Sequence, residues 1–308
     1  MPHIAAHEDV KANRVTRELP RGKGWRTNFL TFPDGTDVTE EPMGFLVEGD
    51  HERIIRPHYH ENDQFQVVVD GGGAMGKHPL SQFAVHFSRA YTPYGPITFG
   101  DSGLSFLTLR ARKDPGAQYL PELRDKLKNI PARSPWQMTE APDFTRTGDV
   151  AVNPFTQIKD ERGLAAYAVS LKPHATLAAP DHTQSGGQHI IVTRGSLAYQ
   201  GKDYKAITIA FVKPDEAGLP LVAGADGLEA LVLNYPRKNA AARKHTITAQ
   251  SREFRVWQCA LCAFVYDEAK GMPHDGIAPG TRWEDVPDTW TCPDCAASKA
   301  DFAMEVVA

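Results

Sequence analysis

Short runs of alternating hydrophobic and polar residues, broken by turn residues, dominate most of the chain. From Trp25 onward the runs W-R-T-N-F-L-T-F, M-G-F-L-V-E, F-Q-V-V-V-D-G-G-G, F-A-V-H-F and L-S-F-L-T-L-R follow one another, with Gly, Pro and Asp between them. Short strands at this spacing are typical of an all-β sandwich or barrel. The pattern therefore predicts a mainly β fold, with a first barrel over residues 25–113.

A second series of predicted strands repeats the first. The runs L-A-A-Y-A-V-S-L, Q-H-I-I-V-T-R-G-S-L-A-Y, A-I-T-I-A-F-V and L-E-A-L-V-L-N-Y-P lie between residues 151 and 236. Residues 64–71 align with residues 188–195, and S-F-L-T-L-R aligns with A-L-V-L-N-Y. Two copies of one β unit indicate a duplication, which predicts a second barrel over residues 151–236.

The segments outside the two series have different patterns. Residues 1–24 are polar and mixed in charge, and we expect a loose arm that lies along a later sheet edge. Residues 114–150 form a connector with one short predicted helix, in which Leu120, Leu123, Leu127 and Ile130 share a face. Residues 237–253 are basic and predict a linker, because a short basic run without interleaved aromatic residues is a weak nucleic-acid signal.

All four cysteines lie in the last segment, residues 254–308. Cys259 and Cys262 form C-A-L-C, and Cys292 and Cys295 form C-P-D-C after a spacer of 29 residues. Two such knuckles supply four thiolates to one tetrahedral centre, a ligand set for zinc or for a single iron. Disulfides or buried thiols are the alternative, but a two-residue gap suits a chelating loop better than a bridge.

Charge and composition bear on the kind of partner and on the cellular compartment. The segment from Arg255 to Ala308 has four Lys or Arg and nine Asp or Glu, a net charge of −5, so the rest of the chain carries +1 of the total of −4. An acidic surface can steer an electron carrier onto a basic partner, or simply keep a small domain soluble. With no run of 18 apolar residues and no signal-peptide pattern, we expect no membrane span, and four metal-binding cysteines suit a reducing cytoplasm.

The cysteine-rich segment resembles rubredoxin along its whole length. Aromatic residues stand where that family keeps its core, at Trp257, Phe264, Tyr266, Trp283, Trp290 and Phe302. Rubredoxin holds one iron in four thiolates and carries single electrons, so the resemblance implies iron at Cys259, Cys262, Cys292 and Cys295, and a reductase or oxygenase as redox partner. Where the family usually has Gly after each knuckle, this chain has Ala263 and Ala296. That departure leaves the reduction potential open.

The first strand series resembles a cupin motif. His58 and His60 are followed by Gln64 and a Gly-rich turn, and residues two apart on a strand point to the same face. Cupins are double-stranded β-helix barrels, and many bind a metal inside, so the resemblance implies a bicupin body over residues 25–236. It also implies His58, His60 and Gln64 as candidate ligands for a second iron or another divalent metal.

Two departures weaken that metal site. Gln64 replaces the family's Glu, and Thr98 stands where the last His would be, while His86 comes too early in the pattern but can still reach in. Two imidazoles and a neutral amide make a poor divalent-metal site, and a pair of hydrogen-bonded pocket histidines is the alternative.

The second copy is further from the motif. It has His182 and Gln188 but no H-x-H, so we expect no metal there and regard His174 and His189 as ordinary histidines. For a small-molecule ligand in the first barrel, Tyr91, Tyr94 and Arg110 are candidate contacts because they lie near the late motif.

Three functions fit the sequence. The first is one-electron transfer through the cysteine centre, attached to a bicupin that binds a small molecule or partner. The second is a cupin oxygenase or other oxidoreductase with iron at His58 and His60, fed by the fused rubredoxin-like domain. Because a dioxygenase draws its electrons from its substrate, a fused donor would fit monooxygenation, reduction of a ferric resting state, or a reductive reaction. The third is a bicupin binding protein with a structural zinc ribbon. Whether the protein is an enzyme stays open, and we expect homo-oligomers.

Overall fold

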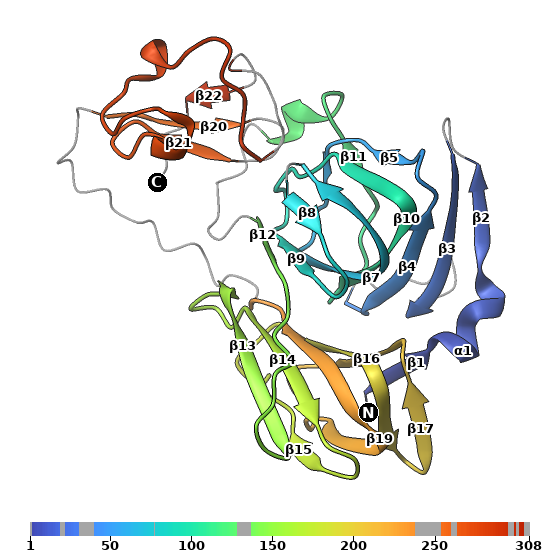
Figure 1. Ribbon diagram of the computed structural model, residues 1–308. Helices are drawn as coiled ribbons and strands as arrows, with labels where there is room; N and C mark the ends of the chain where they lie inside the picture. Colours follow the sequence, from blue (N-terminus) through green and yellow to red (C-terminus); the bar gives the residue numbers. More distant parts are fainter. Residues whose placement is uncertain are drawn as a thin grey trace.

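The computed structural model describes residues 2–18, 22–30, 40–76, 78–127, 137–237, 254–259, 264–294, 299 and 302–304. Two β-barrels form the body, and a small β domain at the C-terminal end lies beside the first barrel (Figure 1). Strands dominate the described residues, in which the one α-helix, α1, covers only His7–Val10. The predicted mainly β fold is confirmed.

The first barrel is built on a nine-stranded sheet with the order β12-β9-β7-β10-β4-β3-β2, with β5 paired to β10 and β8 paired to β7. Its strands are β2 (Val15–Glu18), β3 (Lys23–Leu30), β4 (Met43–Gly49), β5 (Ile54–Ile55), β7 (Gln64–Met75), β8 (His78–Leu80), β9 (Val85–Ser88), β10 (Ile97–Arg110) and β12 (Gln137–Glu140). A separate pair joins β6 (His58–Tyr59) to β11 (Gln118–Tyr119).

The second barrel is built on an eight-stranded sheet with the order β1-β18-β16-β19-β14-β13, with β15 paired to β19 and β17 paired to β16. Its strands are β1 (His3–Ala6), β13 (Val150–Lys159), β14 (Ala165–Leu171), β15 (Thr176–Ala178), β16 (Gln188–Tyr199), β17 (Lys202–Lys205), β18 (Thr208–Val212) and β19 (Pro220–Asn234).

The same strand order in both sheets supports the duplication. The path β9-β7-β10-β4-β3 of the first barrel corresponds to β18-β16-β19-β14-β13 of the second. Pairing corrects one detail of the sequence alignment, which matched Arg110 with Tyr235. Arg110 lies opposite Gln64, whereas Asn234 lies opposite Gln188. The structural equivalent of Arg110 is therefore Asn234, and the predicted register of this strand is wrong by one residue.

Each half of the body lends a strand to the other. β1 precedes the first barrel but pairs with β18 of the second, and β12 leads into the second barrel but pairs with β9 of the first. The N-terminal arm thus spans both barrels, because β2 pairs with β3 after the short 3-10 turn η1 (Lys11–Asn13). In the connector, the predicted helix is represented by a single 3-10 turn, η2 (Arg124–Leu127), while Ile130 lies outside the described residues.

Side chains alternate along each strand, so one set packs between the two barrels and the other set points into the barrel interiors. Phe65 and Val67 of β7 and Leu107 and Leu109 of β10 belong to a cluster that also contains Phe155, Ile158, Ile191, Leu231 and Leu233 of the second barrel. Because these apolar residues are shared, the two barrels are held together as one body. The intervening residues, which point to the opposite face of each strand, line the interior of each barrel.

The C-terminal domain has its own core. A three-stranded sheet joins β20 (Val256–Cys259), β21 (Val265–Asp267) and β22 (Phe302–Met304), and two 3-10 turns, η3 (Pro273–Asp275) and η4 (Trp283–Asp285), follow the second strand. Its buried residues are Cys259, Tyr266, Ile277, Trp283, Val286, Trp290, Cys292 and Phe302. Such a small core needs help from large rings and a bound metal.

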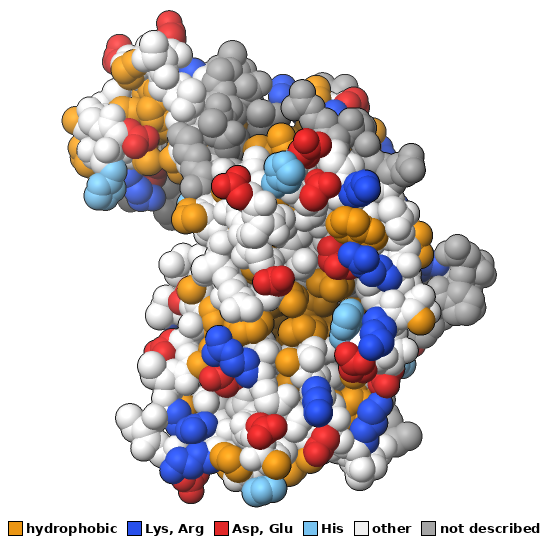
Figure 2. Space-filling view, turned by 45° about the vertical axis from the view of Figure 1, so that its right-hand side comes forward, with side chains coloured by type: hydrophobic (Ala, Val, Ile, Leu, Met, Phe, Trp, Pro, Cys, Tyr) orange, Lys and Arg blue, Asp and Glu red, His pale blue; other side chains and the backbone are white. Residues whose placement is uncertain are grey.

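The distribution of charged side chains on the surface indicates which kinds of partner it can bind. On the face drawn in Figure 2, basic and acidic side chains are interspersed rather than gathered by sign. A continuous basic stripe, the usual footprint of a nucleic-acid-binding surface, is not seen on that face. In the part of the chain that the structure describes, no helix is long and apolar enough to cross a membrane.

Candidate metal centre and barrel cavity

The C-terminal domain brings together one cysteine from each knuckle. Cys259 ends β20 and Cys292 lies beyond η4, and both thiols are buried in the same aromatic cluster. Cys262 and Cys295, like Ala263 and Ala296, lie outside the described residues. Two buried thiols from separate loops, next to stacked rings, have the donor chemistry that a thiolate-bound iron requires. The residues present therefore fit the iron centre that the resemblance implies.

A buried carboxylate that the sequence analysis missed ties this domain together. The Oε1 atom of Glu268 accepts hydrogen bonds from Trp257 Nε1 and from the Trp283 amide, each at 3.0 Å. Its Oε2 atom accepts from the Arg255 amide at 2.8 Å and from Arg282 at 2.9 Å. Burial by itself would raise the pKa of Glu268, but these donors lower it to about 2. The carboxylate stays ionised and links β20 to η4.

The second knuckle contacts the first barrel. Asp294 lies between Cys292 and Cys295, and its Oδ1 atom is 3.1 Å from Nε2 of His78 on β8. A cavity of about 310 Å³ adjoins this contact, and His86 lines its body side. The cysteine loop therefore meets the first barrel at the β7–β8 hairpin.

The H-x-H residues meet inside the first barrel. The rings of His58 and His60 lie edge to face with centroids 5.2 Å apart, and both line a cavity of about 370 Å³. Tyr94 and Arg110, two of the predicted ligand contacts, line the same cavity. Tyr91 instead lines a separate cavity next to Arg162 and Tyr235.

Hydrogen bonds fix the tautomers of both histidines. The Nδ1 atom of His58 is 2.8 Å from the Arg56 carbonyl oxygen, and Nδ1 of His60 is 2.8 Å from Oδ1 of Asp114. Both of these partners are acceptors, so each Nδ1 carries the proton and each Nε2 is left as the acceptor nitrogen. At His60 the nearer, charged Asp114 carboxylate sets this tautomer, although Arg110 Nη2, a donor, also lies 3.1 Å from the same Nδ1. Burial lowers the pKa of His58 to about 3, so its ring is neutral at pH 7.

Both polar atoms of the Gln64 side chain are hydrogen-bonded. Its Oε1 atom accepts a hydrogen bond from Arg110 at 2.7 Å, and its Nε2 atom donates to the Tyr94 hydroxyl. Thr98 lies on β10, away from the lining of the cavity. The amide that replaces the family's Glu is thus held by neighbours on both sides.

His86 lies at an inward position of the first barrel and packs on Tyr94, with ring centroids 5.3 Å apart, but it lines the cavity beside the C-terminal domain and not the cavity of His58 and His60. It lies on β9, opposite Gln66 of β7. Its Nδ1 atom is 2.8 Å from the Thr139 hydroxyl, and its buried Nε2 atom has no hydrogen-bond partner among the described residues. Among those residues, no three His, Cys, Asp or Glu side chains come together as a metal cluster. The residues present in the barrel do not complete the cupin ligand set.

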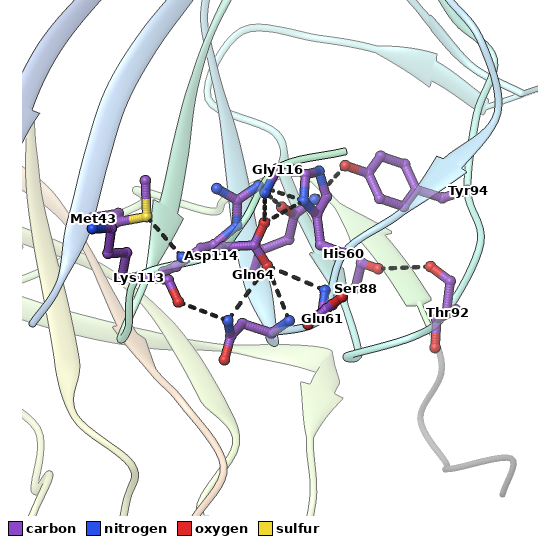
Figure 3. Close-up of polar contacts among 12 residues, drawn as sticks. Met43, His60, Glu61, Gln64, Ser88, Thr92, Tyr94, Lys113, Asp114 and Gly116 are labelled. Atoms are coloured by element: carbon purple, nitrogen blue, oxygen red, sulfur yellow. Dashed lines mark hydrogen bonds and ion pairs between the residues drawn. The ribbon is translucent and has the colours of Figure 1, made fainter. Parts of the chain in front are cut away.

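Asp114 anchors the cavity and was not identified from sequence. It follows β10 and accepts hydrogen bonds from His60, from the Gly116 amide at 2.9 Å, and from the amides of Glu61 and Asn62 at 3.1 and 3.2 Å (Figure 3). Burial by itself would raise the pKa of Asp114, but the His60 contact and the nearby Arg110 help to lower it to about 2. The ionised carboxylate fixes the His60 ring.

The two barrels differ most in their interiors. At five equivalent inward positions, the first barrel has Gln66, His86, Ser88, Thr108 and Arg110, where the second has Ile190, Ala210, Val212, Val232 and Asn234. The second interior is filled by a large apolar cluster. At these positions the first barrel is therefore the polar copy, although buried polar groups cost stability unless they are hydrogen-bonded.

The remaining histidines of the second barrel have structural surroundings. His182 Nε2 is 3.0 Å from the Glu216 carbonyl oxygen, and Gln188 donates to Asn234 at 2.9 Å. His189 is packed against Phe211, and burial lowers its pKa to about 3. His174 is exposed in a turn.

The fold and the cysteine loops define a thiolate metal domain joined to a double cupin body. Residues 256–302 match the rubredoxin family model. Over 50 residues the chain is 67% identical to a rubredoxin of Acinetobacter baylyi, which covers 16% of this chain and 93% of that protein. It is 57% identical over 54 residues to Rubredoxin-2 of Pseudomonas aeruginosa, covering 18% of this chain and 98% of that protein. Through its C-terminal domain, the chain belongs to the rubredoxin family.

Solved structures resemble the body in fold. A Nostoc punctiforme protein named as a candidate dioxygenase gives a TM-score of 0.54 at 13% identity, covering 78% of this chain and 85% of that one. A mutant of Bacillus subtilis oxalate decarboxylase gives 0.51 at 13% identity, covering 76% and 77%. These likenesses show the fold of the body, and the bicupin prediction is confirmed.

Proposed function

We propose that this protein is a one-electron carrier whose rubredoxin domain serves a bicupin body that binds a small molecule. The family match of residues 256–302 is the observation that carries this proposal. Bound iron supplies a one-electron ferric–ferrous couple. The chain's own residues hold the thiols of Cys259 and Cys292 in an aromatic cluster that limits access of water, and Glu268 braces that cluster.

The contact between Asp294 and His78 supports the first barrel as the destination or source of the electron. A fused carrier stays at a high effective concentration near the body, since the chain prevents it from diffusing away. The polar interior also lies in this barrel. A reducing compartment, a homo-oligomer and the boundaries 1–24, 25–113, 114–150, 151–236, 237–253 and 254–308 remain predictions within this proposal.

The redox part is tested on protein purified from its native source, because overexpressed tetrathiolate sites can take up the wrong metal. We expect bound iron and a ferric-thiolate absorption that bleaches on uptake of one electron per chain and returns on oxidation. Colourless protein that contains only zinc would contradict the redox role and would favour a structural zinc ribbon.

The docking part is tested by nuclear magnetic resonance on the full chain. Paramagnetic ferric iron should broaden the amide signals of β8 (His78–Leu80) relative to zinc-loaded protein, while signals of β17 (Lys202–Lys205) stay sharp. His78→Ala should reduce that selective broadening, and His51→Ala, an exposed histidine of the same barrel, should not. Equal broadening in both strands would refute docking at this hairpin without touching the redox role.

An oxygenase with iron at His58 and His60 is the second candidate. The acceptor nitrogens of both rings favour it, because metal-binding histidines usually donate their other N–H to a carbonyl or carboxylate. The engaged amide of Gln64 counts against it. Metal analysis separates the two candidates: the oxygenase requires a second metal that His58→Ala removes, and an unchanged metal content after that substitution would exclude it.

A further inference from the structure

We propose that the cavity of the first barrel binds a small organic anion, a planar carboxylate with an apolar body, and that the guanidinium of Arg110 supplies the positive charge that a metal supplies in other cupins. This inference deepens the proposed function by naming the ligand class. It rests on that function only in assigning the small molecule to this barrel.

The charges around the cavity are unbalanced. Four arginines, Arg17, Arg26, Arg53 and Arg110, line it, together with one carboxylate, that of Asp114. Within the described part of the chain, no carboxylate forms an ion pair with Arg26, Arg53 or Arg110; the nearest polar contacts of the first two are Asn28 Oδ1 and the Glu48 carbonyl oxygen. Arg110 is buried and Arg26 and Arg53 are half-buried, whereas Arg17 is exposed. Because a buried cation is costly when unpaired, an anionic ligand would stabilise this site, chiefly through Arg110.

Asp114 sets one negative charge, near Arg110, against the four guanidinium charges of the lining. Both of its oxygens are occupied by His60 and by backbone amides of the adjoining loops. Among the described residues, two buried polar atoms of the lining also have no hydrogen-bond partner: Nε of Arg110 and Oε1 of Gln66. A bound polar molecule or water is needed to satisfy them.

Arg110 contacts two of the three candidate metal ligands, Gln64 and His60. Its side chain is 2% exposed, donates to Gln64 Oε1 at 2.7 Å and lies 3.1 Å from Nδ1 of His60. A Glu at the position of Gln64 would form a buried ion pair with this guanidinium and cancel its charge. The neutral amide leaves that charge for a ligand, which gives the departure from the cupin motif a physical reason. In the second barrel, the equivalent of Arg110 is the neutral Asn234.

The walls of the cavity favour a flat apolar body. Trp25, Phe45, Phe106 and Tyr119 line it, and the Arg26 guanidinium lies 3.7 Å from the Phe45 ring centroid, as in a cation–π contact. The volume of about 370 Å³ exceeds the roughly 150 Å³ that suffices for benzene. An aromatic monocarboxylate therefore fits both the size and the charge of the site.

Benzoate and its neutral isostere benzamide test this inference by isothermal titration calorimetry on the oxidised, iron-loaded full chain. We expect benzoate to bind at least about tenfold more tightly than benzamide, a difference of about 1.4 kcal/mol. Arg110→Gln and Arg26→Gln should each weaken benzoate binding by at least about tenfold. Arg194→Gln is the matched control, because it removes an exposed arginine, paired with Glu229, from the second barrel.

Each outcome decides the question. Equal affinity for the two probes, no benzoate binding at about 10 mM, or full affinity in Arg26→Gln would overturn the inference, and Arg26→Gln gives this answer even if Arg110→Gln fails to fold. Binding that disappears on treatment with a chelator, with the rubredoxin colour retained, would assign the carboxylate to a barrel metal and also overturn it. Benzoate binding by a colourless zinc protein would contradict the redox proposal and leave the anion-binding inference intact.

Discussion

Replacing Glu268 with Gln should destabilise the rubredoxin domain although Glu268 is not one of the cysteine ligands. The carboxylate accepts two hydrogen bonds on each oxygen, from Trp257 and Trp283 on one side and from Arg255 and Arg282 on the other. An amide has one acceptor oxygen, so its NH2 group must face two donors. Glu268→Gln therefore loses two hydrogen bonds, and the new NH2 group faces two N–H donors.

The lowered pKa of Glu268 gives the expected size of the destabilisation. A carboxyl group whose pKa falls from 4.5 to about 2 on folding contributes about 3 kcal/mol at neutral pH, since one pH unit is worth about 1.4 kcal/mol. The folded-state pKa is the lower one, so this stability is complete above pH 4.5 and is lost as the pH falls toward 2. For a domain this small, about 3 kcal/mol lowers the unfolding midpoint by more than about 10 °C.

Near-ultraviolet circular dichroism of the zinc-loaded full chain provides the assay, because the stacked rings of Trp257 and Trp283 report on this domain. Glu284→Gln is the control: Glu284 also pairs with Arg255, but its side chain is exposed, and exposed pairs contribute little. We expect a large drop in midpoint for Glu268→Gln and none for Glu284→Gln. Equal midpoints for both variants and the parent would refute the reasoning.

Two further predictions concern the first barrel. Gln64→Glu should place a carboxylate against Arg110 and weaken benzoate binding by about tenfold or more, measured by calorimetry; retained affinity would show that the charge of Arg110 is not used. Asp114→Asn should flatten the acid-unfolding curve of the body between pH 3.8 and about 2, followed by far-ultraviolet circular dichroism. The reason is that the pKa of Asp114 is about 2 in the folded protein, so its stabilisation is lost only as the pH falls through that window; an unchanged curve would contradict this role.

Alternation and repetition in the sequence were enough to predict the architecture. Inward and outward positions of β7 and β10 follow directly from the period of two, and the matching strands β16 and β19 follow from the repeat. The register of the last strand was less certain because hydrophobic runs of similar residues align equally well one residue apart. Only pairing with β7 and β16 shows that Arg110 corresponds to Asn234.

The site was harder to predict because its contacts join distant parts of the chain. The H-x-H spacing was enough to place His58 and His60 together, but Asp114 reaches His60 from 54 residues away. Likewise, His78 and Asp294 are 216 residues apart and share no local motif. Sequence spacing constrains neighbours on one element, whereas such contacts depend on how the elements pack.

The contrast between the two barrels is the strongest argument for where a ligand binds. Both copies have the same strand order, and a glutamine begins the equivalent strands β7 and β16, so their backbones present equivalent inward positions. The second barrel fills those positions with Ile190, Ala210 and Val232, which stabilise the body by burying apolar surface. The first has Gln66, His86 and Thr108 there and gives up that stabilisation. Such a loss is expected at a functional site, and the rubredoxin domain contacts this barrel at its β7–β8 hairpin.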